Sequence, residues 1–471
     1  MRWGVFVAAV LACLGSSPLR GACDQELRLQ APQVVDGGVL LRWSPQQQAA
    51  GYRVEYTERW DANSWQSCVP LNQWATTNLF WLDPNPPAVA ARFYRVVAIP
   101  FPPANRGLLL DQKLSNTYSL TELKILLFVA SFPGSAEYAV EFHRVLYETV
   151  DGRGQKTIAS GAILVPAGRS KPAPVLSFQH STVFLRDDVP SRGEGQEFLL
   201  GVGMAACGYV VFMADYVGLG DSPGLHPFLH AQSEATSVVD LIRAGRSCCE
   251  SLGIPLSGQL LLWGYSQGGH ATLAAHREIE LNHPEEMSVS ASAPMAGPYD
   301  LSGTMAPLLL GQEPYASPGY MAYLLFGLNE AYSFFCSPEE LWKSPYHEVL
   351  PPLLDGAHTD SEVNSAMPAV PAQALRPEFL AAYESDPNHE LRSLLRRNDV
   401  NPWPLRGALR FFHCAGDQTV PYIISQRMVE RFHSLGSTDV RLVDPLPTAD
   451  HYPGAVPCFF AAKSWLDSFV R

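Results

Sequence analysis

A serine between two glycines, placed where a strand-like run meets a helix-like run, constrains the fold more than any other feature of this sequence. Residues 257–266 contain an apolar run, and residues 268–283 are alanine-rich and helical in pattern. The junction reads GYSQG over residues 264–268, with Ser266 at its centre. The pattern G-x-S-x-G is typical of a sharp turn that lifts a serine hydroxyl above the edge of a parallel sheet.

Strand-like and helix-like segments alternate along most of the chain. The predicted strands are 141–150, 156–166, 173–181, 209–218, 257–266, 288–297, 407–417 and 440–446. The predicted helices are 231–253, 268–283, one from Ile423 and one at the C-terminus. Such alternation predicts an α/β fold, with a mostly parallel central sheet and helices on both faces.

Three polar residues follow predicted strands in the order serine, acid, histidine. Ser266 ends one strand segment, Asp417 ends the segment 407–417 after its apolar part, and His451 follows the last strand. A serine hydroxyl is a weak nucleophile, so it needs a base to remove its proton and an acid to orient that base. We therefore predict Ser266 as nucleophile, Asp417 as acid and His451 as base.

Neighbouring polar residues offer alternatives to this assignment. Asp417 could instead cap the helix that follows it. Asp444 lies within a predicted strand and Asp450 adjoins the histidine, so both suit the acid role less well. His413 is expected to be structural, and His270, one turn into the helix after the serine, is expected to pack.

An acyl-transfer site also needs hydrogen-bond donors for the oxyanion. The backbone N–H of Gln267, at the start of the helix, is the first predicted donor. The second is expected in the loop after the strand 173–181. We predict the backbone N–H of Thr182, with that of Ser181 as second choice.

Length and charge narrow the class of protein. The chain has 471 residues, which favours two domains. Its hydrophobic content of 47% and charged content of 17% suit a large globular core. The net charge of −13, without any basic run, argues against nucleic acid as a partner.

The pattern of the first 22 residues indicates that the protein is exported. Arg2 precedes an apolar run that ends at Leu14, and small residues follow, as in a secretory signal peptide. A second interpretation is a lipoprotein signal with Cys13 as the lipidated residue. No later segment has eighteen uninterrupted apolar residues, so we expect a soluble protein that is secreted or periplasmic.

Residues 23–100 differ in sequence pattern from the rest of the chain. Short aromatic and β-branched runs alternate with turn residues, which predicts a small all-β sandwich. Trp43, Tyr52 and the segment 93–96 resemble a fibronectin type III domain. A linker is predicted over 101–119, after a proline-rich stretch.

The tryptophans of this sandwich either form a surface that contacts carbohydrate or fill its core, and the second interpretation is favoured. They are Trp43, Trp60, Trp65, Trp74 and Trp81. Among the cysteines, Cys23 and Cys68 both lie in this small unit, so we expect them to pair.

Four segments of the larger part carry a resemblance to a known family. They are FQHST (178–182), ADYVGLGDSPG (214–224), GYSQGGHAT (264–272) and MAGPYDL (295–301). Together they resemble the α/β-hydrolase superfamily, in particular secretory lipases and related esterases, over residues 120–471.

The resemblance implies the same triad, and it implies neither a cofactor nor a metal. In many relatives the oxyanion loop reads His-Gly-x, whereas here it reads His180-Ser181-Thr182. The resemblance also implies a structural loop after the fourth strand, formed by Asp215, Tyr216, Gly218 and Gly220.

Residues 302–400 lack strand signals and are helical in texture, which predicts a cap inserted over the site. Its aromatic segment either lines an acyl pocket or packs the cap onto the core. The predicted pocket residues are Tyr320, Tyr323, Leu324, Leu325 and Phe326.

The sequence thus predicts a secreted serine hydrolase that cleaves carboxylic esters, small or lipid-like, through an acyl-enzyme on Ser266. One alternative is a hydrolase of other acyl bonds, such as a polyester depolymerase or a peptidase. Another is a binding protein on a hydrolase fold that has lost activity. The complete set Ser266, Asp417 and His451 favours an enzyme.

Overall fold

A computed structural model describes residues 29–35, 38–44, 49–58, 66–68, 79–83, 92–100 and 105–470. The chain divides into two compact units. The smaller comprises the chain up to Pro103 with Tyr332–Cys336, and the larger comprises 104–331 with 337–471. The predicted signal peptide and several residues singled out above, Cys13, Cys23, Trp60, Trp65 and Trp74, lie outside the described residues.

Two small antiparallel sheets form the described part of the smaller unit. One has the order β1 (Gln33–Val35), β2 (Gly38–Arg42), β5 (Phe80–Asp83), and the other the order β4 (Gln66–Ser67), β3 (Ala49–Thr57), β6 (Phe93–Pro100). Both contribute to one core, in which Trp43 packs edge-on against Tyr52 at 5.6 Å between ring centroids. Trp43 therefore fills the core, while the fibronectin type III assignment stays a prediction.

The expected pairing of Cys68 is wrong. Cys68 carries a free thiol, and burial raises the pKa of that thiol to about 12. A thiol held protonated in this way is a poor nucleophile for disulfide exchange.

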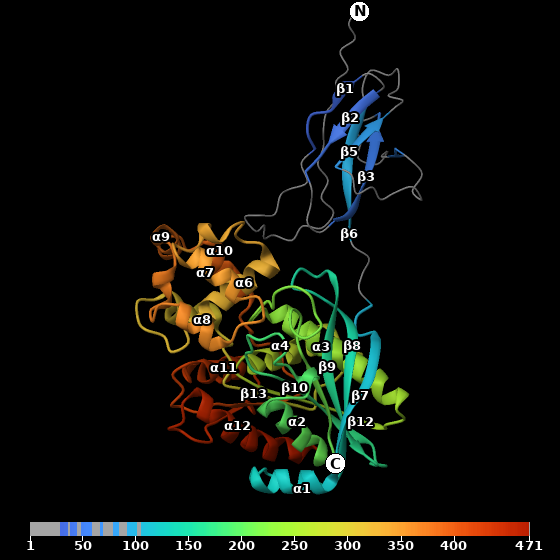
Figure 1. Ribbon diagram of the computed structural model, residues 1–471, viewed down its shortest axis with the longest axis vertical. Helices are drawn as coiled ribbons and strands as arrows, with labels where there is room; N and C mark the ends of the chain where they lie inside the picture. The colour runs from blue at the N-terminus through green and yellow to red at the C-terminus, as the bar shows by residue number, and fades with distance from the viewer. Residues whose placement is uncertain are drawn as a thin grey trace, which may run out of the picture. The chain divides into compact units, whose positions relative to one another are not determined.

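A nine-stranded sheet organises the larger unit (Figure 1). Its order is β15 (Arg441–Val443), β14 (Ala408–Phe412), β13 (Ala291–Met295), β12 (Leu256–Tyr265), β10 (Ala173–Gln179), β11 (Val210–Ala214), β9 (Lys156–Ala167), β8 (Ala139–Val150), β7 (Leu109–Tyr118). The strands from β15 to β11 pair in parallel, and β11, β9, β8 and β7 pair antiparallel. This confirms the predicted α/β class with a mostly parallel sheet.

The linker predicted over 101–119 is wrong from Leu109 onward. Residues Leu109–Tyr118 form the edge strand β7, which pairs with β8 from Leu109↔Tyr147 to Tyr118↔Val140. Most of its side chains are exposed, and polar residues dominate it because an edge strand faces water on several sides. The apolar alternation that marks a strand in sequence is therefore missing.

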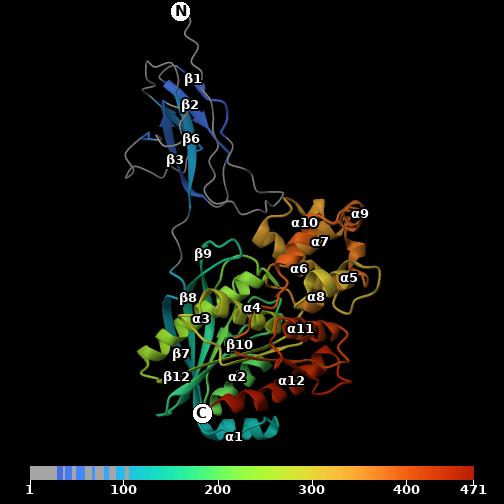
Figure 2. The same ribbon diagram turned by 180° about the vertical axis from the view of Figure 1, so that it is seen from behind.

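Helices cover both faces of the sheet (Figures 1 and 2). On one face lie α1 (Leu120–Val129), α2 (Gln196–Ala206) and α12 (His451–Leu466). On the other lie α3 (Ala231–Ser251) and α4 (Gln267–Asn282). A further helix, α11 (Ile423–Ser434), joins β14 to β15. Among the described residues, no helix combines the length and apolar character that crossing a bilayer requires.

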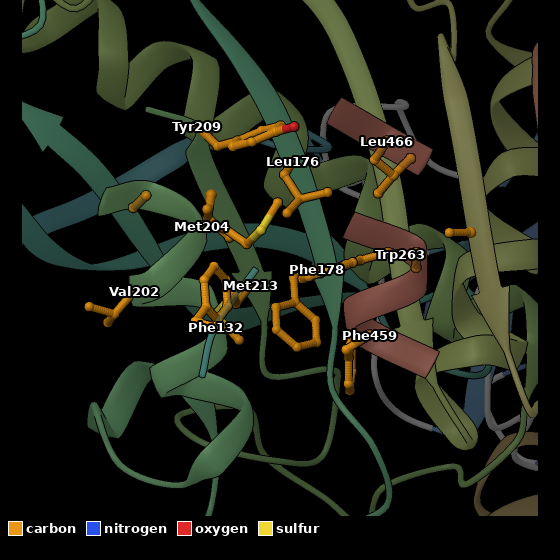
Figure 3. Packing of buried hydrophobic residues seen from close by; sticks show 14 of the residues in the cluster. Phe132, Leu176, Phe178, Val202, Met204, Tyr209, Met213, Trp263, Phe459 and Leu466 are labelled. Carbon is orange, nitrogen blue, oxygen red and sulfur yellow. The ribbon is translucent and has the colours of Figure 1, made fainter. Parts of the chain in front are cut away.

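Large aromatic side chains fix the central strands against α12 (Figure 3). Phe178 of β10 packs on Trp263 of β12 at 5.2 Å, and Trp263 packs on Phe459 of α12 at 5.0 Å. Phe178 and Trp263 are at most 1% exposed. β12 ends just before Ser266 and α12 begins at His451, so this packing ties together the two elements that carry these residues.

The insertion between β13 and β14 is helical, as the sequence predicted. It contains a π-turn (Leu301–Met305), α5 (Ala306–Leu310), α6 (Gly319–Tyr332), α7 (Tyr346–Leu353), α8 (Asp360–Ala366), α9 (Pro377–Ser385) and α10 (Glu390–Arg397). Short 3-10 turns occur at Pro190–Arg192, Pro338–Glu340, Pro371–Ala374 and Asp467–Phe469. The two ends of the insertion meet, because the N–H and Oγ of Ser302 donate to the Asp399 carboxylate at 2.9 and 2.6 Å.

Candidate active site

The junction between β12 and α4 holds Ser266 in a strained conformation. Its backbone has φ 56° and ψ −121°, a region that costs a non-glycine residue free energy and is kept only where the surroundings enforce it. The flanking glycines are required sterically. A Cβ on Gly264 would lie 2.4 Å from the Gly268 oxygen, and one on Gly268 would lie 2.1 Å from the Gln179 oxygen. The turn therefore has the geometry that G-x-S-x-G predicts.

The three residues predicted for the triad meet at the carboxyl ends of their strands. His451 Nε2 lies 2.9 Å from Ser266 Oγ, and His451 Nδ1 lies 2.6 Å from Asp417 Oδ2. All three side chains are buried. Because the carboxylate can only accept, Nδ1 of the neutral ring carries the proton and Nε2 presents its lone pair to the hydroxyl. This arrangement can remove a proton from Ser266.

Asp417 is surrounded by hydrogen-bond donors. Its Oδ1 accepts from the N–H groups of Thr419 (2.9 Å) and Val420 (2.8 Å), and its Oδ2 accepts from His413 Nε2 (3.1 Å) as well as from His451. Burial alone would raise the pKa of the carboxyl, but hydrogen bonds from His413 and His451 outweigh it and hold the pKa at about 2. The carboxylate therefore stays ionised.

The two neighbouring acids, Asp444 and Asp450, accept hydrogen bonds from backbone N–H groups and do not contact the ring of His451. Asp444 Oδ2 accepts from the N–H of Ala415 at 3.2 Å. Asp450 caps α12, since its Oδ1 accepts from the N–H groups of His451 (2.7 Å) and Gln418 (2.8 Å). Asp417 is the acid whose carboxylate the ring contacts.

The residues of the two predicted oxyanion donors, Gln267 and Thr182, line the same cavity as Ser266. The N–H of Gln267 is the first of α4, and the first N–H groups of a helix have no intrahelical acceptor. The N–H of Ser181, the second choice, is occupied because it donates to Glu197 Oε2 at 2.7 Å. The backbone therefore favours Thr182, which lines the cavity beside Ser266 and Gln267.

The cavity above Ser266 is mainly apolar and nearly filled. It is lined by Thr182, Phe228, Leu229, Ser266, Gln267, Pro298, Leu301, Met305, Leu309, Tyr315, Tyr320, Leu324 and Val420. These side chains leave a free volume of about 20 Å³, room for about one water molecule. Among the described residues, no group of three or more His, Cys, Asp or Glu side chains could hold a metal ion.

The predicted pocket residues divide between the two sides of α6. Tyr320 and Leu324, one helical turn apart, line the cavity. Tyr323 packs beside it, stacking on Phe228 at 4.7 Å between ring centroids. The prediction is wrong for the next two residues: Leu325 is buried away from the cavity, and Phe326 stacks on Trp342 at 5.6 Å. A helix turns about 100° per residue, so Leu325 and Phe326 point progressively further around α6 from Leu324.

Several residues at the site were not predicted from the sequence. The lining residues Phe228 and Leu229 lie in a loop without a motif, and Tyr315 lies between two cap helices. Two carboxylates were also not predicted, the buried Glu234 and the partly buried Glu197, which contact the oxyanion segments from other helices. Only the folded chain brings these residues to the site.

Known proteins share sequence and fold with this chain. Residues 194–331 match the secretory lipase family. A search of the curated proteins finds no match.

Solved structures extend the likeness to most of the chain. The rice cell wall degrading esterase LipA from Xanthomonas oryzae, in a ligand-bound form, is 30% identical with a TM-score of 0.70, covering 77% of this chain and 99% of that chain. A Legionella pneumophila protein classed as a hydrolase is 28% identical, with a TM-score of 0.71 and 77% and 98% coverage. Lipase A of Candida antarctica in its closed state shares the fold at 17% identity, with a TM-score of 0.59 and 78% and 83% coverage.

Proposed function

Since this chain belongs to the secretory lipase and esterase group of the α/β-hydrolases, we propose that it is a secreted serine hydrolase. Its substrates are carboxylic esters, which it cleaves through an acyl-enzyme on Ser266. One observation carries the proposal. Ser266 Oγ, His451 and Asp417 form a continuous hydrogen-bonded chain of 2.9 and 2.6 Å beneath an apolar cavity.

In the first half of the reaction, Ser266 Oγ attacks the ester carbonyl carbon while its proton moves to His451 Nε2. Asp417 stabilises the resulting imidazolium through Nδ1. The carbonyl oxygen gains a negative charge and accepts hydrogen bonds from the N–H groups of Gln267 and Thr182. The tetrahedral intermediate collapses, the C–O bond to the alcohol breaks, and the alcohol leaves with the proton from His451.

In the second half, water takes the place of the alcohol. His451 removes a proton from the water, and the resulting oxygen nucleophile attacks the acyl carbon on Ser266. The bond to Ser266 Oγ breaks, Oγ recovers the proton from His451, and the carboxylic acid leaves. Each group that moves a proton in the first half therefore returns to its starting state.

The cavity lining supports an ester with an apolar acyl group as substrate. Leu301, Met305, Leu309 and Leu324 offer an apolar surface, for which each buried methylene contributes about 0.8 kcal/mol. Since the free volume holds about one water molecule, cap side chains must move apart to admit an acyl chain. Secretion is supported by the family and by the apolar N-terminal segment.

A panel of p-nitrophenyl esters from acetate to palmitate tests the proposal, with the p-nitroanilide of the same acyl group as comparison. We expect turnover of the esters, little turnover of the anilide, and covalent labelling of Ser266 by a fluorophosphonate. Ser266→Ala should abolish labelling and lower turnover about 10⁵- to 10⁶-fold. An intact, folded protein that neither hydrolyses an ester nor takes the label would refute the proposal.

A further inference from the structure

A buried carboxylate on α3 reaches the first turn of the helix that carries the nucleophile. Glu234 Oε1 accepts from the side-chain Nε2 of Gln267 at 2.9 Å, and Glu234 Oε2 accepts from His270 Nδ1 at 2.6 Å. All three side chains are at most 1% exposed. Gln267 and His270 are one helical turn apart, so a single carboxylate holds that turn from the side.

The hydrogen bonds of His270 define its charge. Its Nδ1 faces the Glu234 carboxylate and its Nε2 lies 2.9 Å from the carbonyl oxygen of Asn398. Both partners can only accept, so both ring nitrogens must carry protons. Burial opposes this charge, but Glu234 outweighs it and raises the pKa of His270, with Asp399 adding to the effect and His230 nearby. Glu234 and His270 thus form a buried ion pair.

The second amide proton of Gln267 is held as firmly as the first. Gln267 Nε2 lies 2.6 Å from His226 Nε2, while His226 Nδ1 lies 2.8 Å from the carbonyl oxygen of Val217. Burial lowers the pKa of His226 to about 3, so the neutral ring donates through Nδ1 and accepts through Nε2. Both protons of the Gln267 amide are therefore engaged, which fixes its side chain on two sides.

A second carboxylate, which is only partly buried, contacts the other oxyanion segment. Glu197, on α2, accepts from the N–H of Ser181 through Oε2 and from Ser181 Oγ through Oε1, each at 2.7 Å. The Ser181 hydroxyl also lies 3.0 Å from the carbonyl oxygen of Tyr265. Ser181 precedes Thr182 directly, so this bidentate contact fixes the peptide that carries the Thr182 N–H.

From these two sets of contacts we propose that Glu197 and Glu234 are positioning residues of the oxyanion site. Each fixes one of the two backbone donors of that site. The inference rests on the proposed function. A donor stabilises the oxyanion only when it lies about 2.7 to 3.1 Å from the oxygen, so small displacements remove much of its effect. The strained backbone of Ser266 also needs contacts that hold it in place. Two carboxylates from two different helices supply that support.

The variants Glu234→Gln and Glu197→Gln test the proposal on a short p-nitrophenyl ester. Each keeps the side-chain shape but turns an amide NH₂ toward groups that are themselves donors. We expect kcat to fall about 10- to 100-fold, less than the loss of a whole donor, with KM within about twofold of the parent. Affinity for a boronic acid, whose tetrahedral adduct on Ser266 places an oxygen in the oxyanion site, should fall in proportion to kcat.

Glu280→Gln is the matched control. Glu280 is a buried carboxylate on the same helix, α4, and it accepts from His276 (3.0 Å), Trp403 (2.7 Å) and the N–H groups of Arg406 and Gly407. It lies at the far end of the helix from Ser266. We expect this variant to lower the thermal unfolding midpoint while kcat stays within about twofold of the parent.

The outcomes separate this inference from the proposed function. A parent protein without ester turnover or fluorophosphonate labelling would refute the function itself. A parent that turns over esters, with both glutamine variants keeping its kcat and boronate affinity, would overturn the inference alone. Should Glu234→Gln fail to fold, Glu234→Asp replaces it. That variant keeps the charge but shortens the reach, and it should give a kcat below the parent, whereas a parental kcat would contradict the proposal.

Discussion

At the scale of single residues, the proposed acid of the triad accepts four hydrogen bonds. Asp417 accepts from two backbone N–H groups and from two histidine rings. The second ring, His413, has its Nδ1 2.8 Å from Ser425 Oγ and also faces the Val420 carbonyl oxygen through Nε2 at 3.0 Å. His413 therefore orients Asp417 from behind, as Asp417 orients His451.

Asp417→Asn should lower ester turnover about 10⁴-fold, because an amide presents an N–H where His451 needs an acceptor and so favours the wrong tautomer. Stopped-time assays with p-nitrophenyl butyrate measure the loss. Asp444→Asn is the control, since the Asp444 carboxylate accepts from the Ala415 N–H and does not contact the ring of His451. Near-parental turnover in Asp417→Asn together with a large loss in Asp444→Asn would reassign the acid.

At the scale of elements, α6 presents adjacent residues to different surroundings. Leu324 lines the cavity above Ser266, while Leu325 is 1% exposed and does not line it. Neighbouring leucines of the same size thus form a matched pair for separating substrate recognition from stability.

Leu324→Ala should enlarge the cavity and raise the ratio of kcat/KM for octanoate over acetate about tenfold, which corresponds to about 1.4 kcal/mol. Leu325→Ala should leave that ratio unchanged and lower the free energy of unfolding by about 2 to 5 kcal/mol. Ester kinetics and urea unfolding of both variants measure the two effects. Equal ratios in the two variants would show that α6 does not contact the acyl chain.

Strands could be predicted from sequence where burial leaves a pattern. In β10, β11 and β13 every residue is buried, so these strands are mostly apolar in sequence and are bounded by turns. The edge strand β7 could not be predicted, since its exposed residues read as a polar loop. The elbow was predictable because its steric demand for glycine fixes the local sequence.

The candidate site was predictable to the extent that its residues follow strand ends. Ser266, Asp417 and His451 each come after a recognisable strand, and parallel strands bring such positions together. The groups around them carry no such signal. Glu234 contacts Gln267 and His270 across 33 and 36 residues from the first turn of a different helix, and nothing in its local sequence shows that it reaches the site. His270 was assigned to packing because its acceptors come from elsewhere in the chain.

At the scale of the whole molecule, buried histidines link stability to pH. Burial lowers the pKa of His226 and of His230 to about 3. In His230 the Ser233 N–H donates to Nδ1 at 3.2 Å, so that nitrogen must be unprotonated in the folded chain. Unfolding exposes both rings, which then bind protons below their ordinary pKa of about 6.5.

The free energy of unfolding should therefore fall as the pH drops from about 6.5 toward 3, by about 3 kcal/mol per histidine at pH 4.5. His270 acts in the opposite sense, because its raised pKa stabilises the fold at low pH and that contribution is lost as pH rises. Urea unfolding at pH 7 and pH 4.5 measures the net change in the free energy of unfolding from these histidines. His230→Asn, which keeps an N-cap residue for α3, should reduce the pH dependence, and an unchanged slope would contradict the assignment.

The contact between Ser302 and Asp399 joins the start of the cap insertion to its end. A segment that leaves and returns at a single point can be lengthened, shortened or exchanged without shifting the strands on either side, β13 and β14. The cap and the proposed triad can therefore be changed separately. Grafting this segment from a relative onto the present chain should transfer the relative's acyl preference while the inherited chemistry stays intact.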